Sequence, residues 1–262
     1  MHFPASEALV PELMVRASSP STNVELADRA RREELPSFTT LVTDNQTAGR
    51  GRRERTWVAP AGSALAISVL IVPRTVDAPL SLERFGWLTI AAGVAMAETV
   101  GALLPAASVG FKWPNDVLVS GRKVSGILAE LLPERAAVVI GAGVNLSMSL
   151  AQLPVPSATS VAIEGGMPEP DTVLAGYLEG LQRQVIGFLA ADGDAEVSGL
   201  AALARDLCVT LGRQVLVELP GGRVLEGTAT TLDADGRLIV RDAEGTEHAV
   251  AAGDVTHARH AG

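Results

Sequence analysis

The hydrophobic pattern of the chain changes near residue 209, and no other feature constrains the fold as strongly. Before that point, apolar runs of strand length stand beside longer Ala-rich runs with helical period. After it, four short segments at residues 214–219, 223–232, 237–241 and 247–251 alternate apolar and polar residues between Gly-containing turns. Such alternation is typical of half-buried strands. We therefore expect one large domain over residues 1–208 and a small SH3-like β-barrel over residues 209–262.

The large domain is expected to be α+β, with a central mixed or antiparallel sheet, because runs of strands lie beside runs of helices. Residues 1–20 are weakly patterned and predict no element. Thr22 and Glu25 have capping-box spacing at the start of the first helix. The expected helices span residues 21–34, 82–104, 171–189 and 196–208, and the expected strands span residues 38–43, 64–72, 109–113, 116–119, 123–132 and 137–145.

Composition excludes several classes of protein. The net charge of −9 argues against a general nucleic-acid binder. A single cysteine, Cys208, excludes a disulfide framework. None of the four histidines falls between residues 3 and 247, so a His-based nucleophile or a His-ligated metal is not expected in the main body. Any catalysis must therefore depend on electrostatics, positioning and a bound nucleotide or cofactor.

The chain shows no targeting or membrane-spanning pattern. Its N-terminus has no basic residue before Arg16 and no apolar signal core. No apolar run approaches the roughly 18 residues of a membrane span. We expect a cytoplasmic protein that does not contact the membrane.

The segment AGRGRRERTW, residues 48–57, is a candidate anion site. Its two glycines, Gly49 and Gly51, let backbone N–H groups approach a ligand closely. The guanidinium groups of Arg50, Arg52, Arg53 and Arg55 give bidentate recognition of oxygen atoms. The segment is neither a P-loop nor a dinucleotide fingerprint. It suits a phosphate or an adenylate, and the alternative is a solvated basic loop or a nucleic-acid contact.

Two lysines stand out because the chain has only these two, against nineteen arginines. Lys112 and Lys123 both lie in FKWPNDVLVSGRKVSGILAE, residues 111–130. A compact ammonium differs from a planar guanidinium, so these positions favour a point charge. If residues 120–122 form a hairpin turn, Lys112, Asn115 and Asp116 face one cleft with Lys123 and Gly126. The alternative is that Lys123 is a surface charge of the hairpin.

Two weaker signals complete the set. IGAGVNL, residues 140–146, places Gly141 and Gly143 inside a strand, which suggests that another group approaches closely there. Asn145 ends that strand with a donor and an acceptor. Ser21, Thr22 and Asn23 form a helix N-cap, which also presents free N–H groups to a polar ligand.

In this order and spacing, GRGR, KWPND, KxxGIL and the Ser-Thr-Asn segment resemble the biotin protein ligases, also called biotin–[acetyl-CoA-carboxylase] ligases. The resemblance covers about residues 20–146, and the family also has a small C-terminal β-domain. It implies a class II synthetase-like catalytic domain. It also implies a two-step reaction in which biotin and MgATP give biotinyl-5′-AMP, which a lysine of a biotin carboxyl carrier domain then attacks. The substrates are ATP and biotin, Mg²⁺ accompanies ATP, and no protein metal site is implied.

The resemblance assigns roles position by position. Lys123, Arg50 and Arg52 are the catalytic cations. The biotin site takes Ser21, Thr22, Asn23, Gln46, Gly49, Arg50, Gly51, Arg52, Lys123, Gly126, Gly141 and Gly143. The ATP site takes Arg52, Arg55, Lys112, Asn115, Asp116, Lys123 and Asn145. Few residues precede Ser21, so we expect a monofunctional ligase without a DNA-binding domain, acting as a monomer or weak homodimer.

Two positions depart from the family pattern: Pro20 stands where Asp is common, and Glu54 stands where the loop usually has glycine. Glu54 places a carboxylate beside an anion site and removes a hinge.

Two alternative functions are a lipoate–protein ligase and a non-catalytic biotin or nucleotide sensor. We expect the loop at residues 49–55 to be mobile without ligand, Arg50→Gly to release adenylate, and Arg122→Ala to have little effect. The small domain is expected to dock the acceptor or close over ATP.

Overall fold

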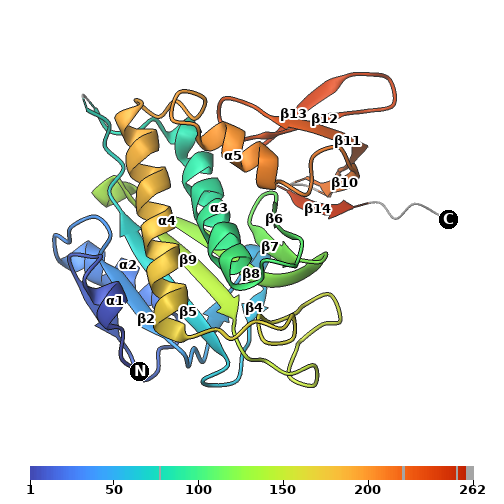
Figure 1. The fold of residues 1–262 in the computed structure, drawn as a ribbon. Helices are drawn as coiled ribbons and strands as arrows, with labels where there is room; N and C mark the ends of the chain where they lie inside the picture. The colour runs from blue at the N-terminus through green and yellow to red at the C-terminus, as the bar shows by residue number, and fades with distance from the viewer. Residues whose placement is uncertain (77, 220–221, 252, 258–262) are drawn as a thin grey trace.

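The large domain is built on a mixed seven-stranded sheet with helices on both faces (Figure 1). The computed structural model describes residues 1–76, 78–219, 222–251 and 253–257, with the side chains of Glu54, Asp254 and His257 outside the description. The strands are β1 (Leu13–Val15), β2 (Thr40–Thr43), β5 (Ala64–Ile71), β6 (Val109–Lys112), β7 (Asp116–Val119), β8 (Arg122–Leu132) and β9 (Ala137–Asn145). Their order is β1-β2-β5-β9-β8-β7-β6. Only the β1–β2 pair is parallel, so the predicted α+β fold with a mixed sheet is confirmed.

All six strands predicted for this domain are present, with ends displaced by at most two residues. The prediction missed α1 (Pro4–Glu7) and β1 in the first twenty residues. Elements of four and three residues are too short to show a period. The prediction of one helix over residues 196–208 was also wrong in its start. Asp194 turns the chain there by accepting the N–H groups of Glu196 and Val197, so α5 is only Leu200–Leu207.

One face of the sheet is covered by α3 (Gly86–Leu103), which packs between the sheet and α4 (Pro170–Ala190). A 3₁₀ turn, η2 (Leu82–Phe85), leads into α3. Residues Leu82–Leu103 are long and apolar enough to cross a membrane by composition alone, which the search for uninterrupted apolar runs missed. Because 67% of that window is buried inside the protein, the segment is a core helix that is apolar on all sides.

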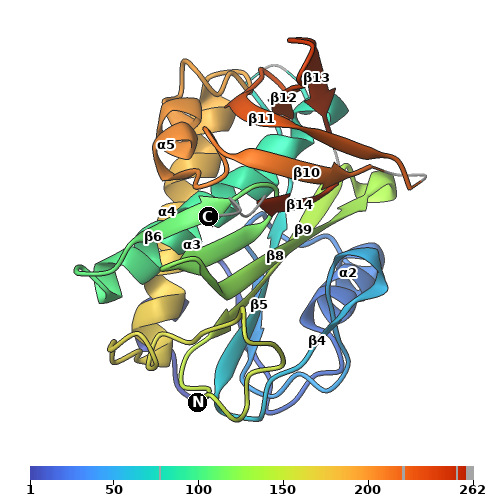
Figure 2. The same ribbon diagram turned by 90° about the vertical axis from the view of Figure 1, so that its right-hand side faces the viewer.

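The other face of the sheet is covered by α2 (Thr22–Arg32) (Figure 2). Leu26, Ala27 and Ala30 of this helix pack on Leu70 and Val139, whose strand neighbours point to the α3 side. The predicted capping box is wrong. Ser21 is the N-cap but makes no side-chain cap bond, and the carboxylate of Glu25 binds Arg16 and Ser19 instead. The start of α2 is therefore free to face a cavity.

The C-terminal residues form a separate antiparallel sheet. Its strands are β10 (Gln214–Glu218), β11 (Val224–Leu232), β12 (Leu238–Arg241), β13 (Glu247–Val250) and β14 (Asp254–His257), in the order β13-β12-β11-β10-β14. The first four were predicted and β14 was not. Closure of this sheet into an SH3-like barrel stays a prediction, because no pairing of β13 with β14 is present among the described residues.

Two tryptophans of the large domain fasten the C-terminal sheet to it. Trp87 of α3 donates its indole N–H to the carbonyl of Ala234 at 2.8 Å, and Trp113 donates to the carbonyl of Gly236 at 3.1 Å. Both indoles are buried, and both acceptors lie in the turn between β11 and β12. Residues on either side of the domain division are thus tied together beside the candidate site.

Candidate functional site

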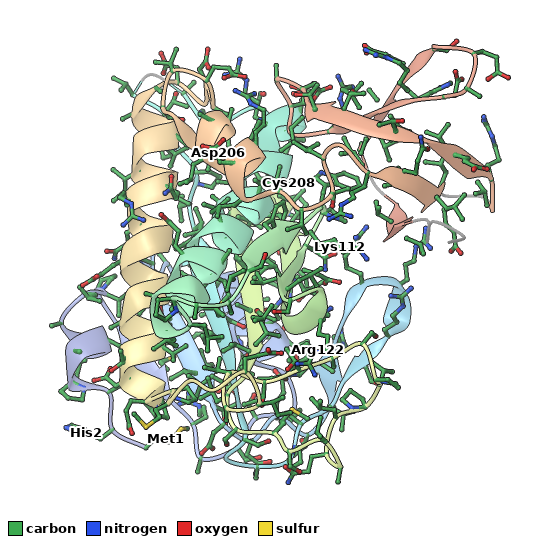
Figure 3. The ribbon with its side chains drawn as sticks, turned by 45° about the vertical axis from the view of Figure 1, so that its right-hand side comes forward. Met1, His2, Lys112, Arg122, Asp206 and Cys208 are labelled. Carbon is green, nitrogen blue, oxygen red and sulfur yellow. The ribbon has the colours of Figure 1, made fainter. Side chains whose placement is uncertain are left out.

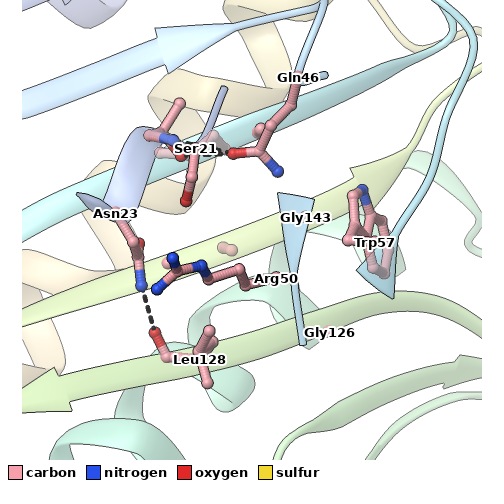
Figure 4. A pocket seen from close by; sticks show the side chains of 13 residues that line it. Ser21, Asn23, Gln46, Arg50, Trp57, Gly126, Leu128 and Gly143 are labelled. Carbon is pink, nitrogen blue, oxygen red and sulfur yellow. Dashed lines mark hydrogen bonds between the residues drawn. The ribbon is translucent and has the colours of Figure 1, made fainter. Parts of the chain in front are cut away.

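A first cavity opens between the start of α2 and the central strands (Figure 4). Ser21, Thr22 and Asn23 come from the helix, and Gly126, Leu128, Gly141 and Gly143 come from β8 and β9. Its full lining is Ser21, Thr22, Asn23, Gln46, Arg50, Trp57, Ala66, Ile67, Gly126, Leu128, Gly141, Ala142 and Gly143. Eight of the residues assigned to biotin from the sequence therefore surround one space.

Hydrogen bonds fix the orientation of Asn23 in this cavity. Its Nδ2 donates to the carbonyl of Leu128 at 3.1 Å and to the carboxylate of Glu130 at 2.7 Å. Both partners are acceptors only, so the group that faces them must be the NH₂. The other end, Oδ1, therefore points as an acceptor toward the cavity and toward Ser68.

Gln46 presents the opposite polarity. Its Oε1 accepts the backbone N–H of Thr22 at 2.9 Å and lies 3.1 Å from the Thr22 hydroxyl. Its Nε2 makes no hydrogen bond within the described part of the chain, so its two N–H groups remain available to a ligand. One amide of the cavity therefore offers an acceptor and the other offers donors.

Glycines keep the cavity open. A Cβ at Gly141 would lie 2.3 Å from Oδ1 of Asn23, and a Cβ at Gly143 would lie 2.6 Å from the ring of Trp57. Gly49 does not line the cavity, but a Cβ there would lie 2.5 Å from Nε2 of Gln46. Side chains at these positions would displace the groups that shape the cavity.

A second cavity adjoins the first, and Arg50, Trp57, Gly126 and Leu128 line both. It collects Gly51, Arg52, Arg55, Lys112, Asn115, Asp116 and Lys123, together with Val255 and Thr256 of β14. The predicted meeting of Lys112 and Lys123 in one cleft is thus present. Within the described residues, no three His, Cys, Asp or Glu side chains group as a metal site.

Two cations of the second cavity, Lys123 and Arg52, are held by other groups of the protein. Nζ of Lys123 lies 2.6 Å from Oδ1 of Asp116 and 5.8 Å from the centroid of the Trp57 ring. Arg52 donates to Oδ1 of Asn115 at 3.1 Å and to the carbonyl of Gly253 at 3.2 Å. An anion that enters must share or replace these partners.

The loop between β3 (Gly49–Arg50) and β4 (Thr56–Trp57) carries the arginines, with a short 3₁₀ turn, η1 (Arg52–Glu54), between the strands. Arg53 adopts a left-handed conformation and binds the carbonyl and carboxylate of Glu218 on β10. Arg50 differs from its neighbours, since its guanidinium makes no hydrogen bond or ion pair within the described residues. It extends across the first cavity toward Asn23 and Leu128 (Figure 4). The expectation for Glu54 concerns a side chain outside the described residues.

A third cavity shares Arg55, Lys112, Asp116 and Lys123 with the second. Asn145 lines this cavity rather than the first two, and its Nδ2 donates to the carbonyl of Thr159 at 2.8 Å. Pro154, Val155, Ser157 and Ala158 form its outer wall. The residues assigned to ATP from the sequence therefore divide between two connected spaces.

Arg122 lies in none of these cavities, although it adjoins Lys123 in the sequence. Lys112 and Arg122 lie on the same side of the molecule (Figure 3). The Arg122 guanidinium pairs with Glu164 at 2.6 Å. Its role is to fasten the segment after β9.

Sequence reasoning missed three residues of this site. Trp57 lines the first three cavities described, and it is the residue against which Gly143 packs. A tryptophan directly after the arginine loop, in a chain with 3% aromatic residues, was a usable signal. Ser68 and Glu130 bind Asn23 from β5 and β8, the strands on either side of β9, and carried no signal that separated them from ordinary strand residues.

Comparison with known proteins gives one family over both parts of the chain. Residues 15–145 match the Biotin/lipoate A/B protein ligase family, and residues 210–257 match the Biotin protein ligase C terminal domain. The chain is 38% identical to the biotin–[acetyl-CoA-carboxylase] ligase of Mycobacterium tuberculosis, over 95% of this chain and 90% of that one.

Solved structures agree with this match. A biotin protein ligase from Aquifex aeolicus in complex with biotin and ATP superimposes with a TM-score of 0.78 at 23% identity, covering 95% of this chain and 100% of that one, which shows the fold. The ligase from Leishmania major in complex with biotinyl-5-AMP gives a TM-score of 0.60 at 25% identity, covering 92% of this chain and 99% of that one.

Proposed function

The chain belongs to the biotin protein ligase family, and we propose that its adjoining cavities divide the ligase reaction between them. The protein is an ATP-dependent ligase that activates biotin as biotinyl-5′-AMP and transfers it to a lysine of a biotin carboxyl carrier domain. The first cavity holds the biotin head group. The second and third cavities hold ATP, and activation takes place where the first and second meet.

A single observation carries this assignment: a cavity that carries the amides of Asn23 and Gln46, and whose one charged lining residue is Arg50, adjoins a cavity lined by arginines and lysines. Biotin has the same division, because its ureido ring is neutral and its carboxylate lies at the end of an alkyl chain. The ring carries N–H donors and a carbonyl acceptor, which match Oδ1 of Asn23 and Nε2 of Gln46. The carboxylate then reaches the boundary of the second cavity.

In the first step the biotin carboxylate attacks the α-phosphorus of ATP, a P–O bond forms, and pyrophosphate leaves. Two anions repel each other as they meet, so fixed cations lower the barrier. Arg50 lines both cavities, and Lys123 and Arg52 line the second, so these three supply the cations. Mg²⁺ enters with ATP and neutralises part of the phosphate charge.

In the second step the amine of the carrier lysine attacks the acyl carbon of the mixed anhydride, and AMP leaves. The anhydride must be kept from water until the carrier arrives. The β3–β4 loop supports this role, since it lies across both cavities and reaches the C-terminal sheet through Arg52 and Arg53.

Other assignments complete the proposal. The domain division lies near residue 209, the small domain helps to close the ATP cavity and to dock the carrier, and the protein works in the cytoplasm as a monomer or weak homodimer without nucleic acid. Gly253, Val255 and Thr256 support the role of the small domain, because they adjoin Arg52 or line the second cavity.

The test is mass spectrometry of a carrier domain incubated with ATP, this protein and either biotin or lipoate. We expect a mass increase of one biotin on one lysine and none with lipoate, whose dithiolane ring has no N–H to match Asn23. A lipoate adduct in place of the biotin adduct would assign the chain to lipoate chemistry. Binding of biotin without formation of adenylate would make it a sensor.

A further inference from the structure

We propose that Ser68 is a positioning residue for biotin: a buried hydroxyl that sets the direction in which Thr22 and Asn23 offer their polar atoms. The inference rests on the proposed biotin site. Ser68 lies on β5, is 0% exposed and does not line the cavity, so it acts on the ligand only through its neighbours.

The distances place Ser68 between the two helix residues. Its Oγ lies 2.6 Å from Oδ1 of Asn23 and 2.8 Å from Oγ1 of Thr22. Oδ1 of Asn23 is an acceptor, since Leu128 and Glu130 fix the NH₂ at the other end of that amide. The single hydrogen of Ser68 must therefore go to Asn23.

This direction determines the next bond. With its hydrogen given to Asn23, Ser68 presents a lone pair to the Thr22 hydroxyl, which lies between Ser68 at 2.8 Å and Oε1 of Gln46 at 3.1 Å. Oε1 of Gln46 already accepts the Thr22 N–H at 2.9 Å. The Thr22 hydroxyl therefore donates to Oγ of Ser68, which is nearer than Oε1 of Gln46 and does not already accept another hydrogen bond from Thr22. Thr22 then keeps lone pairs for a ligand N–H.

Removal of the Ser68 hydroxyl breaks its hydrogen bonds with both Asn23 and Thr22. Thr22 then donates to Gln46 alone, and Oδ1 of Asn23 loses the hydroxyl that donates to it. A buried polar group that loses its partner is unfavourable. We expect the dissociation constant for biotin to rise about tenfold in Ser68→Ala. The cations around ATP are unaffected, so the KM for ATP should stay within about twofold of wild type.

Ser125→Ala is the matched control. Ser125 is also a fully buried serine of the central sheet, on β8, but its hydroxyl has no hydrogen-bond partner among the described residues. Its replacement by alanine should leave the KM for biotin unchanged. Ser68→Thr keeps the hydroxyl and should recover most of the affinity that Ser68→Ala loses.

The experiment measures biotin binding by calorimetry and the KM values for biotin and ATP in adenylate formation, for the full chain and these three variants. Support is a rise of about tenfold in the biotin constants of Ser68→Ala, with the ATP constant unchanged and recovery in Ser68→Thr. An unchanged biotin constant in folded Ser68→Ala overturns the inference. A parallel rise in both KM values also overturns it, because a general structural defect would then be the cause. Failure of the wild type to bind biotin would instead refute the proposed function.

Discussion

The first and second cavities adjoin but are built in different ways. The polar groups of the first, on Thr22, Asn23 and Gln46, are held by hydrogen bonds to the sheet and to one another. The charged groups of the second come from β3, the β3–β4 loop, β6, β7 and β8, and Arg52 also reaches the small domain. The first cavity is therefore fixed before a ligand arrives, whereas the second is completed by contacts between separate parts of the chain.

The difference matters because the proposed function gives the two cavities different tasks. Recognition of a neutral ring requires fixed donors and acceptors, since unpaired buried polar groups lower affinity. Activation requires cations that transfer from protein partners to phosphate oxygens. The Lys123–Asp116 pair is 35% and 24% exposed at its two side chains, so it is weak enough to be exchanged.

The largest effect should come from Lys123→Ala. We expect adenylate formation to fall at least about a hundredfold, because the proposed mechanism places this ammonium where the two anions meet. Arg122→Ala is the control, and it should keep the rate and lower the unfolding free energy by about 1 kcal/mol through loss of the Glu164 pair. The measurement is the amount of biotinyl-5′-AMP that each variant forms in the absence of the carrier domain. A Lys123→Ala rate close to wild type would remove Lys123 from the mechanism.

A smaller but selective effect is expected from Gly143→Ala. The added Cβ would lie 2.6 Å from the Trp57 ring, so Trp57 must move and narrow the first cavity. Biotin affinity should fall about tenfold or more. Gly187→Ala on α4 is the control, since nothing lies within 4 Å of its Cβ position. Calorimetry that found full biotin affinity in Gly143→Ala would show that Trp57 does not border the bound ring.

Loss of loop contacts should make the enzyme release its intermediate. Arg50→Gly removes a cation that has no partner in the described protein, whereas Arg52→Gly also frees the loop from Asn115 and the carbonyl of Gly253. We expect several-fold more labelling of an unrelated lysine-rich protein, with Arg52→Gly exceeding Arg50→Gly. The variants are mixed with biotin, ATP and that protein. Labelling equal to wild type, with adenylate synthesis intact, would mean that the loop does not retain the adenylate.

The smallest effect should come from Trp113→Phe, which removes the indole N–H that binds Gly236. Trp113 lines the second cavity, so the KM for ATP should rise about threefold to fivefold. Trp87→Phe removes a similar bond to the same turn without touching that cavity. Thermal unfolding should show similar destabilisation of both variants. A rise in the KM for ATP with both would indicate a loosened domain contact rather than a local effect.

The sequence predicted the central strands well because each is a run of apolar residues bounded by clear turns. The hairpin at residues 120–122 pairs β7 with β8 as expected, and the antiparallel pairing of β6 with β7 adds Lys112 to the same cleft as Lys123, since short antiparallel pairing is determined locally. The two glycines of β9 marked close approach, and the structure places Asn23 and Trp57 against them. These predictions depended on residues near one another in the sequence.

What the sequence did not predict depends on contacts between distant segments. Ser68 meets Asn23 only because β5 passes under the start of α2, and Glu130 meets it from β8. The carboxylate of Glu25 makes no capping-box hydrogen bond, because it binds the side chains of Arg16 and Ser19 instead. A polar residue of a strand gives no local sign of the partner that the fold brings to it.

One comparison of two variants, Asn23→Ala and Lys123→Ala, tests the division between the cavities most directly. Biotin affinity is measured by calorimetry without nucleotide, and the rate of adenylate formation is measured at saturating biotin. Asn23→Ala should lose about tenfold or more in biotin affinity and keep most of its adenylation rate. Lys123→Ala should lose at most about fivefold in affinity and at least about a hundredfold in rate. Equal losses of affinity and rate in both variants would contradict the account, because the cavities would then act as one site.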